Sequence, residues 1–227
     1  MVVTGKVFRL VEALPLPEIA SRLKGYRVEK TAQEGEQSFT LITEVTELSV
    51  GEGIVSGVYA EDYLMHVFHR GRSYAVPRTL SAYFGFMEHD GRIFLAVLEK
   101  KLRANRIAKR LGLILFGRKG MIVEARIPPE HLAEFHTRNP KESKVIYFDN
   151  LDAPNITKVA IYGPDLVETE LFKHYMSRGD LWYVVAKAEK YDYVVGVTRD
   201  GCVVIFNTRD KNSYLEYVRR EILPMAL

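Results

Sequence analysis

The sequence predicts an α+β protein in which antiparallel sheets have helices packed on one face. Three observations lead to this fold class. Alternating apolar and polar residues recur along the N-terminal half, which is typical of half-buried strands. Asp-Gly pairs at 90–91 and 200–201 lie between apolar runs and favour tight hairpin turns. A segment with helical periodicity follows each hairpin, at 101–115 and 212–223.

Local signals predict the first elements of the chain. Residues 2–11 have the pattern of a strand. A short helix is expected to begin at the Pro-Leu-Pro sequence 15–17 and to end at Gly25, because Pro suits the first helical turn and Gly the exit. The polar stretch 31–37 is predicted to be a loop.

Most of the N-terminal half is predicted to be extended. The acidic pair Glu61-Asp62 is expected to join two separate strands, and Pro77 to mark a sheet edge or bend. The expected strands of this half are 39–48, 54–60, 63–68 and 74–87.

The second half alternates between helices and strands. The last helix begins near Ser213, with Glu216 three residues later in a capping-box pattern. The other elements expected here are strands at 121–127, 144–148, 158–162 and 181–188 and helices at 128–136 and 165–175.

Two units are predicted. Residues 1–138 form a β-rich unit that ends in the basic helix and the helix 128–136, and residues 139–227 form an α+β unit. One compact domain is the alternative. The repeated order of hairpin and helix also raises the hypothesis that the chain holds two related hairpin–helix units.

Composition narrows the class of protein. The 227 residues contain no apolar run long enough for a membrane span, and the first residues do not resemble a signal peptide. The single cysteine, Cys202, cannot form an internal disulfide, so a reducing, cytoplasmic compartment is expected. Few Gln and Cys beside many charged residues favour a thermophilic host.

Positive charge is concentrated in the middle of the chain. Residues 66–126 hold 13 Lys and Arg against 4 Asp and Glu, whereas residues 1–65 hold 6 against 10. Clustered cations attract phosphate, and six of them crowd residues 100–110 without an acid between them. Asn105 lies among them, and Asn can pair with adenine. The predicted phosphate contacts of this helix are Lys100, Lys101, Arg103, Arg106, Lys109 and Arg110.

The loop after this helix extends the basic region. Arg118 and Lys119 lie between Gly117 and Gly120, so free backbone amides and two cations can bind an anion together. A phosphate-binding P-loop is rejected, because no Ser or Thr follows. The hairpin-turn cations Arg70, Arg72 and Arg92 join the predicted interface, and Tyr74, Tyr83 and Phe84 between them would stack bases if exposed.

These patterns predict a non-catalytic nucleic-acid-binding protein that contacts the phosphate backbone of DNA or RNA, with no cofactor and no membrane. The alternative is an assembly module whose basic surface docks on an acidic protein partner, on a second copy or on its own acidic N-terminal third. The third hypothesis is a metal-dependent nuclease. Its candidate ligands are Asp62, His66, His69, Glu88, His89 and Asp90.

Overall fold

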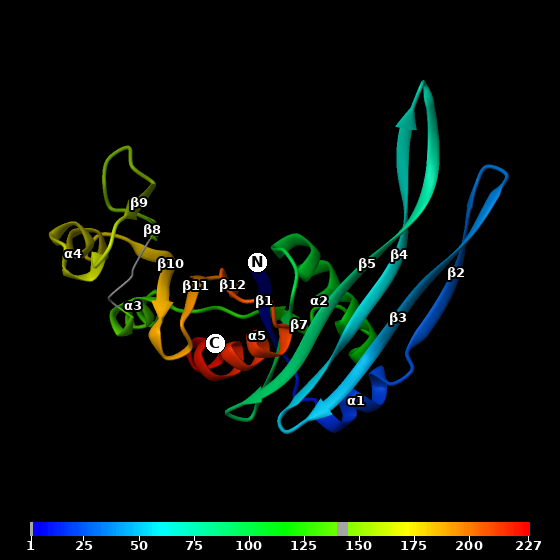
Figure 1. Cartoon of the computed structure of the whole chain (residues 1–227), viewed down its shortest axis with the longest axis horizontal. Helices are drawn as coiled ribbons and strands as arrows, with labels where there is room; N and C mark the ends of the chain where they lie inside the picture. Colours follow the sequence, from blue (N-terminus) through cyan, green and yellow to red (C-terminus); the bar gives the residue numbers. More distant parts are fainter. Residues whose placement is uncertain (1, 140–144) are drawn as a thin grey trace.

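A computed structural model describes residues 2–139 and 145–227. The predicted α+β class is confirmed, because helices accompany one large antiparallel sheet (Figure 1). Its twelve strands are β1 (Val3–Leu10), β2 (Arg27–Glu34), β3 (Gln37–Gly51), β4 (Ile54–His69), β5 (Arg72–His89), β6 (Arg92–Val97), β7 (Ile122–Glu124), β8 (Val145–Asp149), β9 (Lys158–Tyr162), β10 (Asp180–Ala188), β11 (Tyr193–Thr198) and β12 (Cys202–Ile205).

The strand order is β2-β3-β4-β5-β6-β1-β12-β11-β10-β8-β9, and β7 pairs with the end of β1. Strand β1 is therefore central: β6 and the hairpin β5–β6 lie on one side of it, and β12 and the hairpin β11–β12 on the other. One sheet runs through both predicted units. The boundary predicted at 138–139 adjoins residues 140–144, which lie outside the described residues.

Five α-helices accompany the sheet among the described residues. They are α1 (Leu16–Leu23), α2 (Lys101–Phe116), α3 (Pro129–Arg138), α4 (Glu170–Met176) and α5 (Lys211–Tyr217), which continues through 218–225 as π and 3₁₀ turns. Among the described residues, none of these helices has both the length and the apolar character needed to cross a membrane.

The core has two parts, one on each face of the sheet. Neighbouring residues of a strand point to opposite faces, and Val7 and Phe8 of β1 belong to different apolar clusters. Phe8 packs in the cluster that contains Ala104 of α2, and Val7 in the cluster that contains Leu215 of α5. The expectation that the helices pack on one face is therefore wrong: both faces of the central strands are apolar, so each needs its own cover.

Glu61-Asp62 does not join two strands, as the sequence had indicated, because β4 runs unbroken from residue 54 to 69. The structure supplies partners that keep these acids in a strand. The Asp62 carboxylate accepts hydrogen bonds from the Ile42 amide at 3.0 Å and from the Thr79 hydroxyl at 2.6 Å. Two arginines of α2 pair with Glu61.

Two other local predictions are also wrong. The polar stretch 31–37 belongs to a hairpin of β2 and β3 rather than to a loop, with Gly35 at a positive φ in its turn. Helix α5 is capped by Asp210, whose carboxylate accepts from the amide of Ser213 at 2.8 Å. In the first case strand pairing overrides the low strand propensity of polar residues. In the second the cap is local, but it lies three residues before Ser213, the position that the capping-box pattern had indicated.

Candidate nucleic-acid interface

The longest hairpin of the sheet extends beyond its neighbours as a two-stranded arm, residues 63–78. Pairing between β4 and β5 continues to His69 and Arg72, whereas the pairing of β3 with β4 stops at Glu61. Figure 1 shows the arm projecting from the body of the molecule, with the β2–β3 hairpin beside it. At about 3.3 Å per residue, its seven residue pairs extend it by roughly 23 Å.

The arm is positively charged and contains no acidic residue. Its cations are Arg70, Arg72 and Arg78, and none of them forms an ion pair with another described residue. Arg70 and Gly71 form the turn with φ angles of 47° and 76°, the positive values that a tight two-residue hairpin turn needs. His66 lies 3.1 Å from the Glu34 carboxylate at the tip of the neighbouring hairpin.

The arm also exposes apolar and aromatic side chains. Phe68 is 75% exposed and Tyr74 is 48% exposed, and Val67 and Val76 are exposed as well. Residues paired across two strands share a face, so Tyr74 and Val67 lie on one face of the arm together with Arg72. Cations beside exposed aromatic rings offer both phosphate contacts and stacking surfaces.

Helix α2 packs at the root of the arm, on the face of the sheet that carries Glu61 and Tyr63. Arg106 contacts the Glu61 carboxylate at 3.1 Å and Arg110 contacts it at 3.0 Å. The Arg106 guanidinium also lies 5.8 Å from the ring centre of Tyr63. Glu61 is almost fully buried, whereas both arginines remain nearly half exposed.

Further cations of the predicted interface pair within the chain. These pairs are Lys101 with Asp200 at 2.5 Å, Arg103 with Glu99 at 3.4 Å, and Arg118 with Glu12. Lys100, Lys109 and Lys119 are exposed and form no ion pair with another described residue. Part of the basic charge of α2 is therefore neutralised inside the chain, which weakens its attraction for phosphate.

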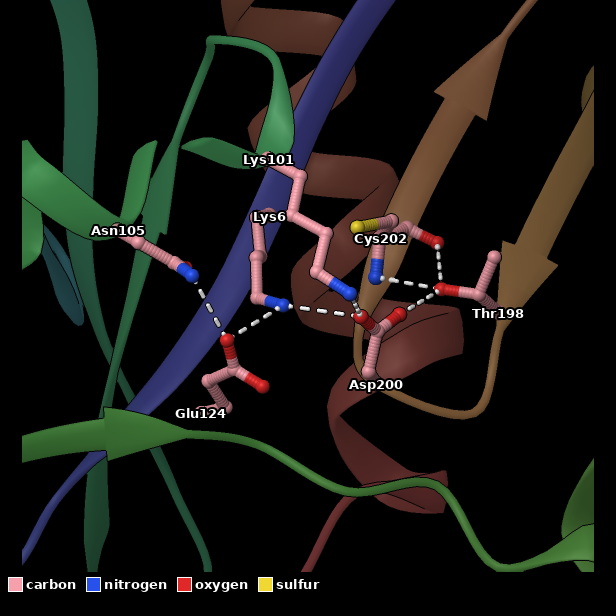
Figure 2. A network of polar contacts seen from close by, with 7 residues as sticks. All are labelled: Lys6, Lys101, Asn105, Glu124, Thr198, Asp200 and Cys202. Atoms are coloured by element: carbon pink, nitrogen blue, oxygen red, sulfur yellow. Dashed lines mark hydrogen bonds and ion pairs between the residues drawn. The ribbon is translucent and has the colours of Figure 1, made fainter. Parts of the chain in front are cut away.

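Asn105 is held by a polar network rather than directed freely outward (Figure 2). Its side-chain nitrogen donates to Glu124 at 2.9 Å. The same carboxylate oxygen lies 3.0 Å from the ammonium of Lys6, a side chain with no exposed surface. The predicted contact of Asn105 with adenine stays a prediction, and it would compete with this hydrogen bond.

The centre of the network is the ion pair of Lys6 with Asp200, 3.2 Å apart. Burial by itself would raise the pKa of Asp200. The hydrogen bonds from Lys101, Thr198 and Lys6 outweigh this effect and hold the pKa well below its ordinary value. Cys202 lies beside this pair, and burial raises the pKa of its thiol, so the thiol stays protonated at neutral pH.

The residues proposed for a nuclease are spread along the β4–β5 hairpin. His66 and His69 point to opposite faces, as their spacing on a strand predicts. His89 and Asp90 lie 3.4 Å apart at the far end of β5, and Arg92 follows that turn. In the described part of the chain, no three His, Cys, Asp or Glu residues gather as a metal site.

Sequence reasoning found the turn cations Arg70 and Arg72 but missed the arm that carries them. The available signal was the acid-free stretch 63–78, which has strand-forming residues on both sides of an Arg-Gly turn. The arm was missed because Glu61-Asp62 was interpreted as a junction between two strands. Of the aromatics considered for stacking, Tyr74 is exposed, whereas Phe84 is fully buried in the core.

Comparison of the sequence with models of protein families finds no match, and comparison with curated proteins finds none either. The function of this chain is therefore inferred from its own residues.

Proposed function

We propose that this protein binds nucleic acid without catalysis and that the β4–β5 arm is its principal contact. The observation that carries the proposal is the composition of the arm, which combines exposed aromatic side chains, no acid and three arginines that form no ion pair with another described residue. A two-stranded ribbon fits the major groove of duplex DNA, and aromatic rings stack on the bases of single strands. The exposed lysines of α2 add weaker phosphate contacts.

Removing the cations of the arm tests this assignment. The triple variant Arg70→Ala, Arg72→Ala, Arg78→Ala is expected to lower affinity roughly ten- to hundredfold near 0.15 M salt, because fewer counterions are released on binding. The slope of log affinity against log salt should fall by about two to three units. Fluorescence anisotropy with labelled duplex DNA, single-stranded DNA and RNA across a salt series measures both quantities.

A matched triple variant separates the arm from the helix. Lys100→Ala, Lys109→Ala, Lys119→Ala removes the same charge from exposed positions just before, on and after α2. We expect it to weaken binding less than the arm variant does. Equal losses in both variants would assign the contact to general positive charge, and no binding of any nucleic acid by the unmodified protein would refute the proposal.

The exposed ring of Tyr74 gives an independent test. Tyr74→Ala is expected to weaken binding of a single strand by about tenfold, since stacking on one base contributes about 1–3 kcal/mol. The salt slope should not change, because no charge is lost. Tyr74→Phe keeps the ring and should bind as the unmodified protein does. A loss of equal size in Tyr74→Phe would show that stacking is not the contact.

A further inference from the structure

A cavity of about 600 Å³ lies at the root of the arm, between the strands β2, β3 and β4 and the second half of α2. Its walls include the apolar side chains of Leu41, Leu64 and Leu113. Its floor is polar: Tyr59 and Glu61 line it although both are buried. This volume and this mixture of surfaces are typical of sites for small ligands.

The polar groups of the floor are incompletely satisfied. The Tyr59 hydroxyl is fully buried and forms no hydrogen bond of ordinary geometry with a described residue, although the Glu61 side chain lies close enough to interact with it. Burial, with the charge of Glu61 beside it, raises the pKa of Tyr59, so the hydroxyl keeps its proton and remains a donor. A buried donor without a partner is unfavourable, and a ligand that accepts from it would remove the penalty.

The neighbouring carboxylate supplies the opposite function. Arg106 and Arg110 each approach one oxygen of Glu61, and a carboxylate has about four acceptor positions in all. Glu61 can therefore accept further N–H groups from a ligand. The floor thus offers an O–H donor beside a carboxylate acceptor, which is complementary to a ring edge that places a hydrogen-bond acceptor beside an N–H.

The mouth of the cavity is suited to an anion. Arg106 and Arg110 keep nearly half of their side-chain surface exposed, and Lys30 is exposed at the rim. Each arginine directs only part of its five N–H donors at Glu61, so donors remain for a phosphate. Tyr63 adds an aromatic wall beneath Arg106, against which a planar ring can stack.

We propose that this cavity binds a nucleotide, because the edge of a base places a hydrogen-bond acceptor beside an N–H donor. The base contacts Tyr59 and Glu61 at the floor, and the phosphate lies against Arg106 and Arg110 at the mouth. This site is separate from the arm. The nucleotide can be free or part of a bound strand, and the experiment distinguishes these two sources.

Calorimetric titration of the full chain tests the site with GMP, UMP, AMP and inorganic phosphate. The three nucleotides are expected to bind more tightly than inorganic phosphate, because only they carry a base. Tyr59→Phe removes only the hydroxyl and should weaken the nucleotides by about tenfold, the effect of one hydrogen bond to a buried group, while phosphate is unchanged. Tyr162→Phe removes a hydroxyl from an exposed tyrosine outside the cavity and serves as the matched control.

A second variant gives a signature that a structural role would not produce. Glu61→Gln should weaken GMP yet strengthen inorganic phosphate, because Arg106 and Arg110 are no longer neutralised. The thermal midpoint of Tyr59→Phe should equal or exceed that of the unmodified protein, since an unpartnered buried group is removed. A marked fall of this midpoint would show that the hydroxyl has a protein partner and would overturn the proposal.

Other outcomes also overturn it: equal binding of GMP and inorganic phosphate, unchanged GMP binding in Tyr59→Phe, or no nucleotide binding at millimolar concentration. An oligo(U) single strand distinguishes a free nucleotide from a base of a bound strand. If Tyr59→Phe weakens binding of oligo(U) as well as UMP, the site takes a base from a strand; if it weakens only mononucleotides, the ligand is free. The arm triple variant should bind GMP normally, so failure of the arm and failure of the cavity are distinguishable.

Discussion

Replacing Asp200 by asparagine is expected to lower the free energy of unfolding by about 3 kcal/mol. Lys6 has no exposed surface, and Asp200 is one of its two carboxylate partners. Asparagine has a similar shape but no charge, so the buried ammonium keeps only Glu124, which is 43% exposed. A buried charge that loses a partner retains its desolvation penalty, and this is why the expected loss is large.

Replacing Lys6, the other member of this ion pair, is expected to have a smaller effect. Lys6→Met removes the buried charge itself and keeps a long apolar side chain in its place. Glu124 remains accessible to water, and Asp200 keeps its contacts with Lys101 and Thr198. We therefore expect a loss below about 1.5 kcal/mol. Urea denaturation of both variants measures the two values, and a larger loss in Lys6→Met than in Asp200→Asn would contradict this account.

The Asp200 carboxylate makes the stability of the protein depend on pH. Its pKa in the folded protein lies below its value of about 3.9 in the unfolded chain. As the pH falls through about 4, the unfolded chain takes up the proton first, so the stabilisation by Asp200 is complete above this pH and declines below it. The difference in stability between the unmodified protein and Asp200→Asn should shrink as the pH falls from 5 to 2. A constant difference would show that the charge of Asp200 is not its cause.

Shortening Leu215 is expected to destabilise the protein by about 2–5 kcal/mol, because Leu215→Ala leaves a cavity where α5 packs on the sheet. The contact partner is Gly85 of β5. A Cβ atom added to Gly85 would lie 2.7 Å from a methyl carbon of Leu215. Gly85→Ala alone should therefore cost about 1–3 kcal/mol through overpacking.

The two substitutions together should be less harmful than their sum. The methyl group of Gly85→Ala enters space that Leu215→Ala vacates, so a double-mutant cycle is expected to show a favourable coupling of at least about 1 kcal/mol. Chemical denaturation of the four proteins measures it. Simple additivity would mean that α5 shifts on the sheet rather than packing rigidly at this position.

Short-range patterns determined much of this protein. The hairpin at Asp90-Gly91 needs only a backbone that accepts positive φ angles at the turn, and the helix at 101–115 needs only its apolar stripe, so both follow from a few neighbouring residues. The placement of Arg70 and Arg72 in a hairpin turn and the concentration of positive charge in the middle of the chain were equally evident.

Only the tertiary structure determined which charged residues pair and which faces of the sheet the helices cover. The pair Glu61-Asp62 was predicted to connect two strands because nothing near it in the sequence neutralises Glu61. Its partners, Arg106 and Arg110, lie on a helix about 45 residues away along the chain. Helices cover both faces of the sheet because β1 is central and apolar on each side. The local alternation of apolar and polar residues does not determine the order of the strands. The arm, the buried Lys6 and the cavity over Tyr59 depend on pairing between distant segments, which no short window of sequence contains.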